Sequence, residues 1–233
     1  MSSSEEGAVY NAIRSRKSVR AFLPNNIPSE LILELLELGA RAPSGTNIQP
    51  WQAFVVRRDI IAEISNSIKQ SGISPERADW DDYKYYPQVL TEPFLGRRRT
   101  LGEDLYSSLG ISRRDIAARR TQFMRNYDFF GAPVGIFFSI SRHLETGSYI
   151  DLGMMMQNIM IAARAVGLHT CPQAAFAPFH RIIRPIIGLP SDQVLVCAMA
   201  VGFEDVADPV NQVKTDRIPM EDWVTLVSKK RSE

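Results

Sequence analysis

The chain has 233 residues, 23% charged and 45% hydrophobic, and its 27 basic and 26 acidic residues leave a net charge of +1. This length suits one domain with a substantial core, and the balanced charge argues against a dedicated nucleic-acid or membrane-surface protein. No apolar stretch is long enough to span a bilayer, no signal pattern opens the chain, and its two cysteines lack metal-ligand spacing. We therefore expect a cytoplasmic protein without a metal site.

The N-terminal part of the chain predicts three helices and one strand. Apolar spacing indicates a helix over residues 6–14, and Pro28-Ser29-Glu30 opens a second helix with an N-cap type residue and an acid in its first turn. Gly39 favours the end of this helix. Residues 51–56 predict a buried strand, and residues 60–70 predict a third helix.

The next segment differs in composition from the rest of the chain. Residues 73–99 are charged, rich in Tyr and Trp, and broken by prolines, which is typical of an insertion that covers a site. Two helices are predicted around and after its end, over residues 98–109 and 113–127. Ser112 and Asp115 resemble a capping box before the second of them. We expect one domain, residues 1–233, with an insertion or lid at about 73–127.

The second half of the chain predicts strands over residues 134–140 and 193–203, and helices over residues 149–166 and 179–187. Residues 170–176 are interpreted as a tight loop, and residues 220–227 are amphipathic. Strands are few and their order with the helices is mixed, which favours an α+β fold. No GxGxxG motif lies at a strand–helix junction, so the sequence does not support a Rossmann dinucleotide site.

A basic run is the first candidate binding segment. Arg14, Arg16, Lys17 and Arg20 surround the hydroxyl of Ser18 where a helix gives way to extended chain. Guanidinium groups bind phosphate oxygens in a bidentate manner, and a hydroxyl adds a donor. The alternative is a solvated basic helix end, which also suits the helix dipole.

A polar loop, residues 42–51, is the second candidate. Asn47 and Gln49 stand between Pro43 and Pro50, and their amides both donate and accept hydrogen bonds. Such groups match the carbonyl, N–H, carbonyl edge of a flavin pyrimidine ring. The alternative is an ordinary turn that leads into a strand.

Two later segments are further candidates. Small residues in 170–176 would let a flat ring lie against the backbone, although a packed tight loop has the same composition. Lys214-Thr215-Asp216-Arg217 offers a second cationic anchor, although alone it is typical of a surface charge cluster.

Taken together, these motifs resemble those of the FMN-dependent nitroreductases, in particular the bacterial nitroaromatic reductases. The motifs are Arg-Lys-Ser-x-Arg-x-Phe from Arg16, Pro-Ser-x-x-Asn-x-Gln-Pro-Trp from Pro43, Cys171-Pro172 and Arg217-x-Pro219. Their combination in this order is more specific than any one alone. The resemblance covers residues 10–225. It implies an α+β fold with a central, mainly antiparallel sheet wrapped by helices, and an intertwined homodimer with two FMN sites at its interface.

The resemblance also implies a set of FMN-binding residues: Arg16, Lys17, Ser18, Arg20, Pro43, Ser44, Gly45, Asn47, Pro172, Gln173, Ala174, Ala175 and Arg217. Arg16 and Ser18 would bind the phosphate and ribityl region of FMN, Arg217 would close on the phosphate, and Lys17 would contribute mainly its backbone. Arg20 would lie near the N1 side of the ring and stabilise the reduced flavin by its charge.

The remaining positions would contact the ring. Residues 43–47 would approach it from the other subunit, while Pro172 to Ala175 would line one face and direct a backbone N–H at N5. The chain has Ala174-Ala175 where some family members have Glu-Gly, and Thr215 where some have Lys. The first change leaves backbone contacts intact, and the second gives Arg217 less help.

The function implied by the resemblance is a reductase that works in two half-reactions. NADH or NADPH would deliver hydride to the flavin and leave, and a nitroaromatic or quinone-like acceptor would then be reduced in the same pocket. No histidine is nominated as catalytic, since the flavin carries the chemistry.

Three alternatives remain open. The same scaffold resembles enzymes that dehalogenate, dehydrogenate or fragment flavin, and a flavin-binding protein without turnover would share the motifs. A nucleic-acid-binding role for the arginine-rich helices is the least favoured alternative.

Overall fold

The computed structural model describes residues 3–75, 78 and 80–227, with side chains from residue 7 onward. Its helices are α1 (Ser3–Ser15), α2 (Ser29–Gly39), α3 (Arg58–Gln70), α4 (Phe94–Ser108), α5 (Ile116–Met124), α6 (Thr146–Ala165) and α7 (His180–Ile187). Its strands are β1 (Trp51–Arg57), β2 (Val134–Ser141), β3 (His169–Gln173) and β4 (Gln193–Gly202). Short 3-10 helices are η1 (Gly45–Asn47), η3 (Arg125–Gly131), η4 (Ala174–Phe179), η5 (Pro209–Gln212) and η6 (Met220–Asp222).

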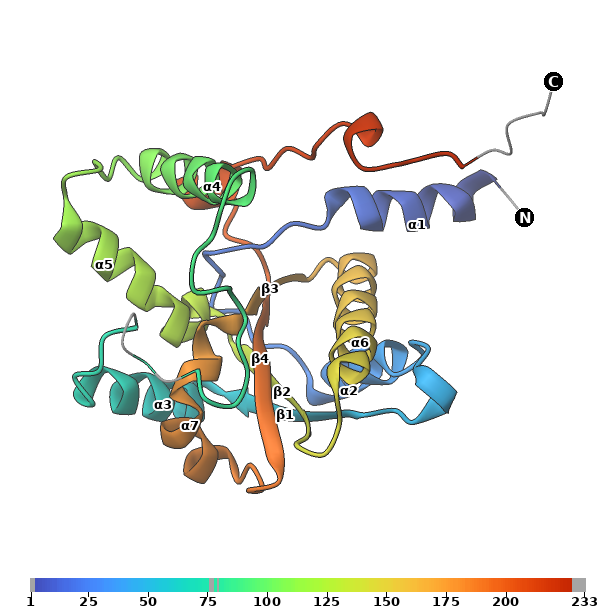
Figure 1. The fold of residues 1–233 in the computed structure, drawn as a ribbon, viewed down its shortest axis with the longest axis horizontal. Coiled ribbons are helices and arrows are strands. Elements are labelled where there is room, and N and C mark those ends of the chain that lie inside the picture. Colours follow the sequence, from blue (N-terminus) through green and yellow to red (C-terminus); the bar gives the residue numbers. More distant parts are fainter. Residues whose placement is uncertain (1–2, 76–77, 79, 228–233) are drawn as a thin grey trace.

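The four strands form one sheet in the order β1-β2-β4-β3, and every neighbouring pair is antiparallel. Successive residues of a strand face opposite sides, and on β2 the side chain of Phe137 joins one core cluster while Ile136 and Phe138 join the other. Helices α3 and α7 cover the first face, and α2 and α6 cover the second (Figure 1). The expected α+β fold with a central antiparallel sheet is confirmed.

An aromatic cluster fills the core on the α3 and α7 face. Phe129 stacks on Phe176 with ring centroids 4.5 Å apart, and Phe137 meets Phe176 edge-on at 5.2 Å. Tyr127 packs edge-on against Phe176 and Phe179. Edge-on and offset pairs are the preferred aromatic geometries. Phe176 and Phe179 belong to η4, which follows β3 directly. The cluster therefore fixes the segment in which the candidate residues 172–175 lie.

Several predicted element boundaries need correction. Helix α5 begins at Ile116 and ends at Met124, and Asp115 itself is the N-cap, since its carboxylate accepts a hydrogen bond from Ala118 N at 2.9 Å. The proposed capping box from Ser112 is therefore wrong. The strand predicted over residues 51–56 is confirmed and extends to Arg57, but β1 lies at the sheet edge and much of it is exposed rather than buried.

One further prediction fails in the second half of the chain. Residues 169–173 form β3 rather than a loop, because they pair with β4 from His169↔Gly202 to Gln173↔Ala198. The amphipathic segment 220–227 forms only the 3-10 turn η6, and its apolar side chains Met220, Trp223 and Leu226 are exposed. No helix among the described residues is both long and apolar enough to cross a membrane.

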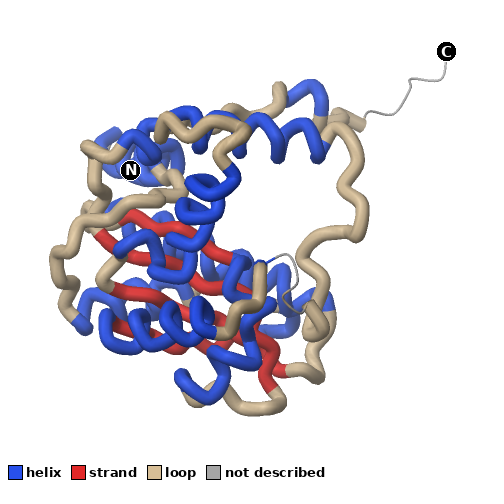
Figure 2. The backbone as a smooth tube through the Cα atoms, turned by 90° about the vertical axis from the view of Figure 1, so that its left-hand side faces the viewer, coloured by secondary structure: helices blue, strands red, loops and turns tan. Residues whose placement is uncertain are grey.

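Residues 80–86, here called the strap, lie across the sheet end and are tied to the body. Asp82 pairs with Arg142 at 2.8 Å, and Asp81 pairs with His180 at 2.7 Å. The hydroxyl of Tyr83 donates to the carbonyl of Val196. Beyond the strap the chain arches away from the sheet before it reaches α4 (Figure 2). The strap is therefore anchored to the body of the protein, whereas the segment that follows it lies away from the sheet.

Candidate binding site

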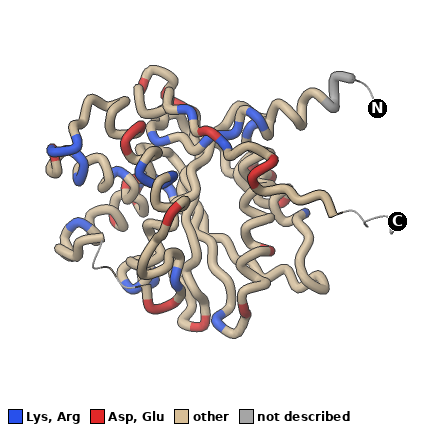
Figure 3. The backbone as a smooth tube through the Cα atoms, turned by 45° about the horizontal axis from the view of Figure 1, so that its top comes forward, with Lys and Arg blue, Asp and Glu red and all other residues tan. Residues whose placement is uncertain are grey.

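The basic run is extended chain laid beside β3. Ser18 forms a parallel bridge with Thr170, and Val19 N donates to Thr170 O at 3.1 Å. Side chains of extended chain alternate between two sides. Val19 and Ala21 are buried in the core, so Ser18 and its even-numbered neighbours face the other way. Figure 3 shows basic positions gathered where α1 ends.

Lys17 faces inward with the buried residues. Its ammonium lies 2.6 Å from the Glu204 carboxylate, whose side chain is only 7% exposed, and donates to Asn211 O at 2.7 Å. The Glu204 carboxylate also lies 3.1 Å from His169 Nε2. Lys17 is thus engaged within the protein, which leaves its backbone as the part available to a ligand.

Asn211 joins three segments through its side-chain amide. Its Oδ1 accepts from Arg20 N at 2.8 Å, and its Nδ2 donates to Ala21 O and Asp205 O, both at 2.8 Å. The residue is only 3% exposed. Such a fully bonded buried amide stabilises one conformation of its neighbours. Sequence reasoning missed Asn211 and Glu204, because nothing local connects them to the basic run.

Arg16 and Arg217 come from opposite ends of the chain to one place. The pKa of Arg16 is lowered, first by burial and then by the nearby charge of Arg217. Arg217 donates to Thr215 Oγ1 at 3.0 Å and to the carbonyls of Thr215 and Asp216. The hydroxyl of Thr215 therefore orients Arg217. Like charges that interact in this way disfavour each other's charged form, so an anion bound between the two guanidinium groups would stabilise both, as a phosphate would.

Ser18 and Arg20 extend the same site toward β3. The Arg20 guanidinium donates to Ser18 O at 3.1 Å. Both residues act on Cys171: burial raises the pKa of its thiol, while the charge of Arg20 and a hydrogen bond from Ser18 oppose that rise. Cys171 is 2% exposed, which fits a packed thiol better than a redox group.

The segment Pro172 to Ala175 leads from β3 into η4. Pro172, Ala174 and Ala175 are partly exposed, so their backbone is accessible at the surface. Gln173 differs, because its side chain is buried and donates to Asn126 O at 2.8 Å. The side chain of Gln173 therefore belongs to the core rather than to a ligand site.

The polar loop is exposed and has a defined shape. Thr46, Asn47 and Gln49 have positive φ angles of 48°, 62° and 48°, a backbone region that few side chains adopt. Ser44 Oγ accepts from Gln49 N at 3.0 Å, and Gly45 N donates to Asp151 Oδ2 at 3.2 Å. The loop thus presents Asn47 in a conformation held by the protein itself.

The polar loop and the basic run lie near opposite ends of α6. Gly45 bonds Asp151 near the start of the helix, whereas Ser15 accepts from Arg164 Nε near its end at 3.2 Å. With a rise of 1.5 Å per residue, these anchors are about 20 Å apart along the axis. The structure therefore brings Arg16, Ser18, Arg20, Arg217 and residues 172–175 together, but it does not bring Pro43, Ser44, Gly45 and Asn47 of the same chain to them.

Comparison with known proteins identifies relatives of this arrangement over nearly the whole chain. Residues 13–203 match the model of the nitroreductase family. The chain is 36% identical to 4-nitrobenzoate reductase of Nocardioides sp. (strain LMS-CY), over 92% of this chain and 88% of that protein. It is 34% identical to nitrobenzene nitroreductase of Ectopseudomonas oleovorans, over 94% of this chain and 96% of that protein.

A solved structure agrees in fold. The crystal structure of the FMN and NADPH-dependent nitroreductase NfnB from Sphigopyxis sp. strain HMH superposes with a TM-score of 0.89 at 36% identity, and the match covers 95% of this chain and 99% of that one. The motifs, the fold and these matches agree with one another, and the chain belongs to the nitroreductase family.

Proposed function

We propose that the protein is an FMN-dependent oxidoreductase that uses NADH or NADPH to reduce nitroaromatic or quinone-like acceptors in the cytoplasm. The observation that carries this proposal is the electrostatic interaction of the partly buried Arg16 with the exposed Arg217, beside Ser18 and the partly exposed residues Pro172, Ala174 and Ala175. The relatives named above reduce nitrobenzoate or nitrobenzene, or depend on FMN and NADPH, as their names state.

The described residues fit FMN along its length. Arg16, Ser18 and Arg217 would hold the phosphate by charge-assisted hydrogen bonds. Arg20 lies further along the extended segment, where its cation would stabilise negative charge on the ring. Ala174 and Ala175, next to Pro172, would let the ring lie close to the backbone, and the donors would be the N–H groups of the two alanines, since Pro172 has none.

A second copy of the chain would complete the site. The polar loop of one chain lies about 20 Å from its own basic run along α6, farther than one cofactor ring would reach from the phosphate site. Apolar side chains on α1 and near the C-terminus are exposed, among them Val9, Tyr10, Met220 and Trp223. Both segments extend to the same side of the molecule (Figure 1). A homodimer would cover these side chains and bring the partner's polar loop to the ring.

Bound FMN would supply the redox chemistry, by taking electrons from the nicotinamide and passing them to the acceptor. The chain's own residues bind and orient it and adjust its charge. No histidine of the described part lies among the candidate residues, so water would exchange protons with the acceptor. Residues 73–127 would act as a lid that excludes bulk water from the ring.

The proposal is tested by titrating cofactor-free protein with FMN and with riboflavin, which lacks the phosphate. Replacing Arg217→Gln or Arg16→Gln should weaken FMN binding by about tenfold to a hundredfold, since a charged hydrogen bond contributes roughly 1.5–3 kcal/mol. Riboflavin binding should change little. Arg14→Gln, in the same run but exposed, is the matched control.

Turnover is the second part of the test. The FMN-loaded protein should be bleached by NADH or NADPH and should recover when a nitroarene or quinone is added. Bleaching without recovery on any acceptor would leave only a flavin-binding role. Equal affinity of the wild type for FMN and riboflavin would refute the phosphate site.

A further inference from the structure

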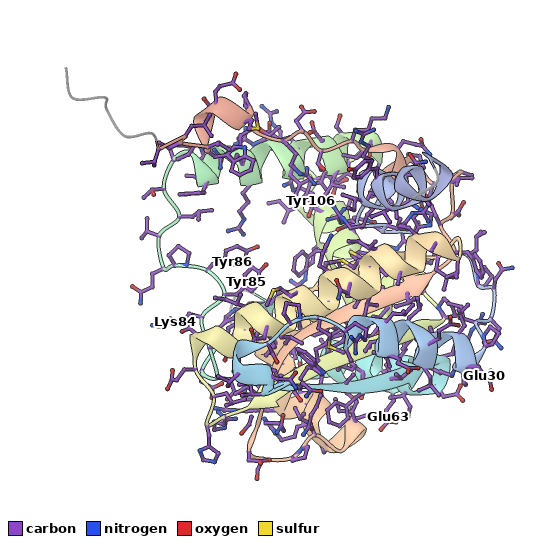
Figure 4. The ribbon with its side chains drawn as sticks, turned by 90° about the vertical axis from the view of Figure 1, so that its right-hand side faces the viewer. Glu30, Glu63, Lys84, Tyr85, Tyr86 and Tyr106 are labelled. Carbon is purple, nitrogen blue, oxygen red and sulfur yellow. The ribbon has the colours of Figure 1, made fainter. Side chains whose placement is uncertain are left out.

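The strap holds two tyrosines that no part of the FMN site uses. Tyr85 and Tyr86 meet edge-on with ring centroids 4.6 Å apart, and they are 52% and 53% exposed. They extend from the strap toward the body of the protein, whereas Lys84 points to the opposite side (Figure 4). Just before them, Asp82 pairs with Arg142 and Tyr83 donates to Val196 O, so the strap that carries these rings is held on the body of the protein.

This tyrosine pair lies near the segment assigned to the flavin ring. Burial, then Tyr86 and then Cys197 raise the pKa of Tyr85, so Tyr85 is within electrostatic reach of the Cys197 thiol. Burial raises the pKa of Cys197 to about 12, opposed by a hydrogen bond from the backbone of Gln173. The geometry agrees, because the Tyr83 hydroxyl donates to Val196 O on β4, two residues from Ala198, which is the register partner of Gln173. The strap that carries the tyrosines is therefore bonded to the same part of β4 that pairs with Gln173.

Arg98 of α4 adds a cation to the tyrosine pair. Its guanidinium carbon lies 5.3 Å from the ring centroid of Tyr86, within cation–π range. Arg98 is exposed, and among the residues that the structure describes no carboxylate pairs with it. Its neighbour Arg99 differs, because it faces Glu92 at 3.8 Å. Arg98 thus has free donors beside two aromatic rings.

This combination has a specific chemical match. Aromatic rings favour a flat aromatic ligand by stacking or edge contact, and a guanidinium fork fits a carboxylate with two parallel hydrogen bonds. We propose that Arg98, together with Tyr85 and Tyr86, forms a subsite that selects carboxylate-bearing nitroarenes over uncharged ones. The proposal rests on the nitroreductase activity proposed above and names the acceptor class for the same site.

The test compares 4-nitrobenzoate with 4-nitrobenzyl alcohol, which is similar in shape but uncharged. For wild-type enzyme loaded with FMN, kcat/KM should be at least tenfold higher for the acid at low ionic strength. Arg98→Gln should lower kcat/KM for the acid tenfold to a hundredfold, mainly through KM, and should leave the alcohol within twofold. Arg99→Gln, which alters an adjacent arginine already facing a carboxylate, should leave both unchanged. Arg98→Lys should restore only part of the preference, since an ammonium lacks the fork.

A binding measurement separates this inference from the reductase activity. Benzoate cannot be reduced, so its dissociation constant can be measured from the absorbance change of bound FMN and from tyrosine fluorescence. Arg98→Gln should raise that constant at least tenfold even if no nitroarene is turned over. An unchanged benzoate affinity in Arg98→Gln, or an unchanged acid-to-alcohol ratio, would overturn the proposal, whatever the outcome of the turnover assays.

Discussion

The ammonium of Lys17 lies 2.6 Å from the carboxylate of Glu204, and this ion pair joins the basic run to the end of β4. Because Lys17 faces inward, its two neighbours Arg16 and Ser18 face the other side of the extended chain. In the basic run, Lys17 thus forms an ion pair within the fold, whereas Arg16 and Arg20 are left to bind a ligand.

Replacing Lys17→Met should therefore weaken both folding and FMN binding. Glu204 would remain buried without its cation, and we expect a loss of about 2 kcal/mol in the free energy of unfolding. This is below the roughly 3–5 kcal/mol of fully buried pairs, because the Lys17 side chain is 40% exposed. Denaturant unfolding and FMN titration measure the two effects.

Lys69→Met is the matched control for Lys17→Met. Lys69 lies 2.9 Å from Asp128, but both side chains are more than 40% exposed. Such surface pairs contribute about 0–1 kcal/mol. If both variants lost the same stability, the inward Lys17–Glu204 pair would have no special role in holding the run.

Asn211→Leu should damage the phosphate site through the backbone. The change removes the partners of Arg20 N, Ala21 O and Asp205 O, and an unpaired buried polar group costs roughly 1–3 kcal/mol. We expect a stability loss of about 3 kcal/mol. We also expect the ratio of FMN to riboflavin affinity to fall at least fivefold, because the segment that carries Arg16 and Ser18 is no longer fixed.

Gln212→Leu is the control for Asn211→Leu. Gln212 is the adjacent amide, exposed, and its Nε2 donates to Val206 O at 2.6 Å. Its loss should cost less than 1 kcal/mol and leave the affinity ratio unchanged. A purely structural role for Asn211 would lower FMN and riboflavin affinity by equal factors, and that outcome would contradict the positioning role.

The basic run could be identified from the sequence itself, whereas the backbone role of Lys17 was implied only by the family resemblance and stays a prediction. The sequence was not sufficient to identify Asn211 or Glu204, whose contacts with residues 17–21 arise only in the folded chain. The FMN-binding residues themselves stay a prediction, tested by the titrations above.

Strand β3 shows why one element escaped prediction. Pro172 cannot donate a backbone hydrogen bond and reads as a loop signal, yet an edge strand tolerates it, and β3 is the last strand of the sheet order. Conversely, the amphipathic segment 220–227 forms only a 3-10 turn, and its side chains Trp223 and Leu226 are exposed because they have no core to pack against within one chain.

His169 should make stability depend on pH. Burial and then the charge of Arg164 lower the pKa of His169 to about 4, although Glu204 opposes the shift. The unfolded chain has the ordinary value of about 6.5, so between these values it binds more protons than the folded chain. The free energy of unfolding should therefore fall as pH drops from 6.5 to 4, by up to about 1.4 kcal/mol per unit.

The measurement compares denaturant unfolding of the wild type and His169→Gln from pH 7 to pH 4.5. Carboxylates contribute to both slopes, so the difference between the slopes isolates the histidine. His143→Gln, at an exposed position, should behave as the wild type. Identical slopes for the wild type and His169→Gln would show that His169 titrates normally in the folded protein.

Gly135→Ala should be among the most destabilising of the small substitutions. A Cβ at this position on β2 would lie 2.5 Å from Phe129 Cζ and 2.6 Å from Cε1. The Phe129 ring cannot move easily, since it is fully buried and stacks on Phe176. Overpacking of this kind costs about 1–3 kcal/mol, which corresponds to a Tm lower by roughly 3–10 °C for a chain of this size.

Two further variants make this last prediction specific to the contact. Gly102→Ala places a Cβ in α4 with nothing within 4 Å, so it should stabilise the protein by about 0.5–1 kcal/mol through helix propensity. Phe129→Leu removes the ring that the new Cβ meets. If the contact is the cause, the double variant Gly135→Ala with Phe129→Leu should cost less than the sum of the single changes. If the stability loss of the double variant equals the sum of the two single losses, the contact with Phe129 is not the cause of the Gly135→Ala effect.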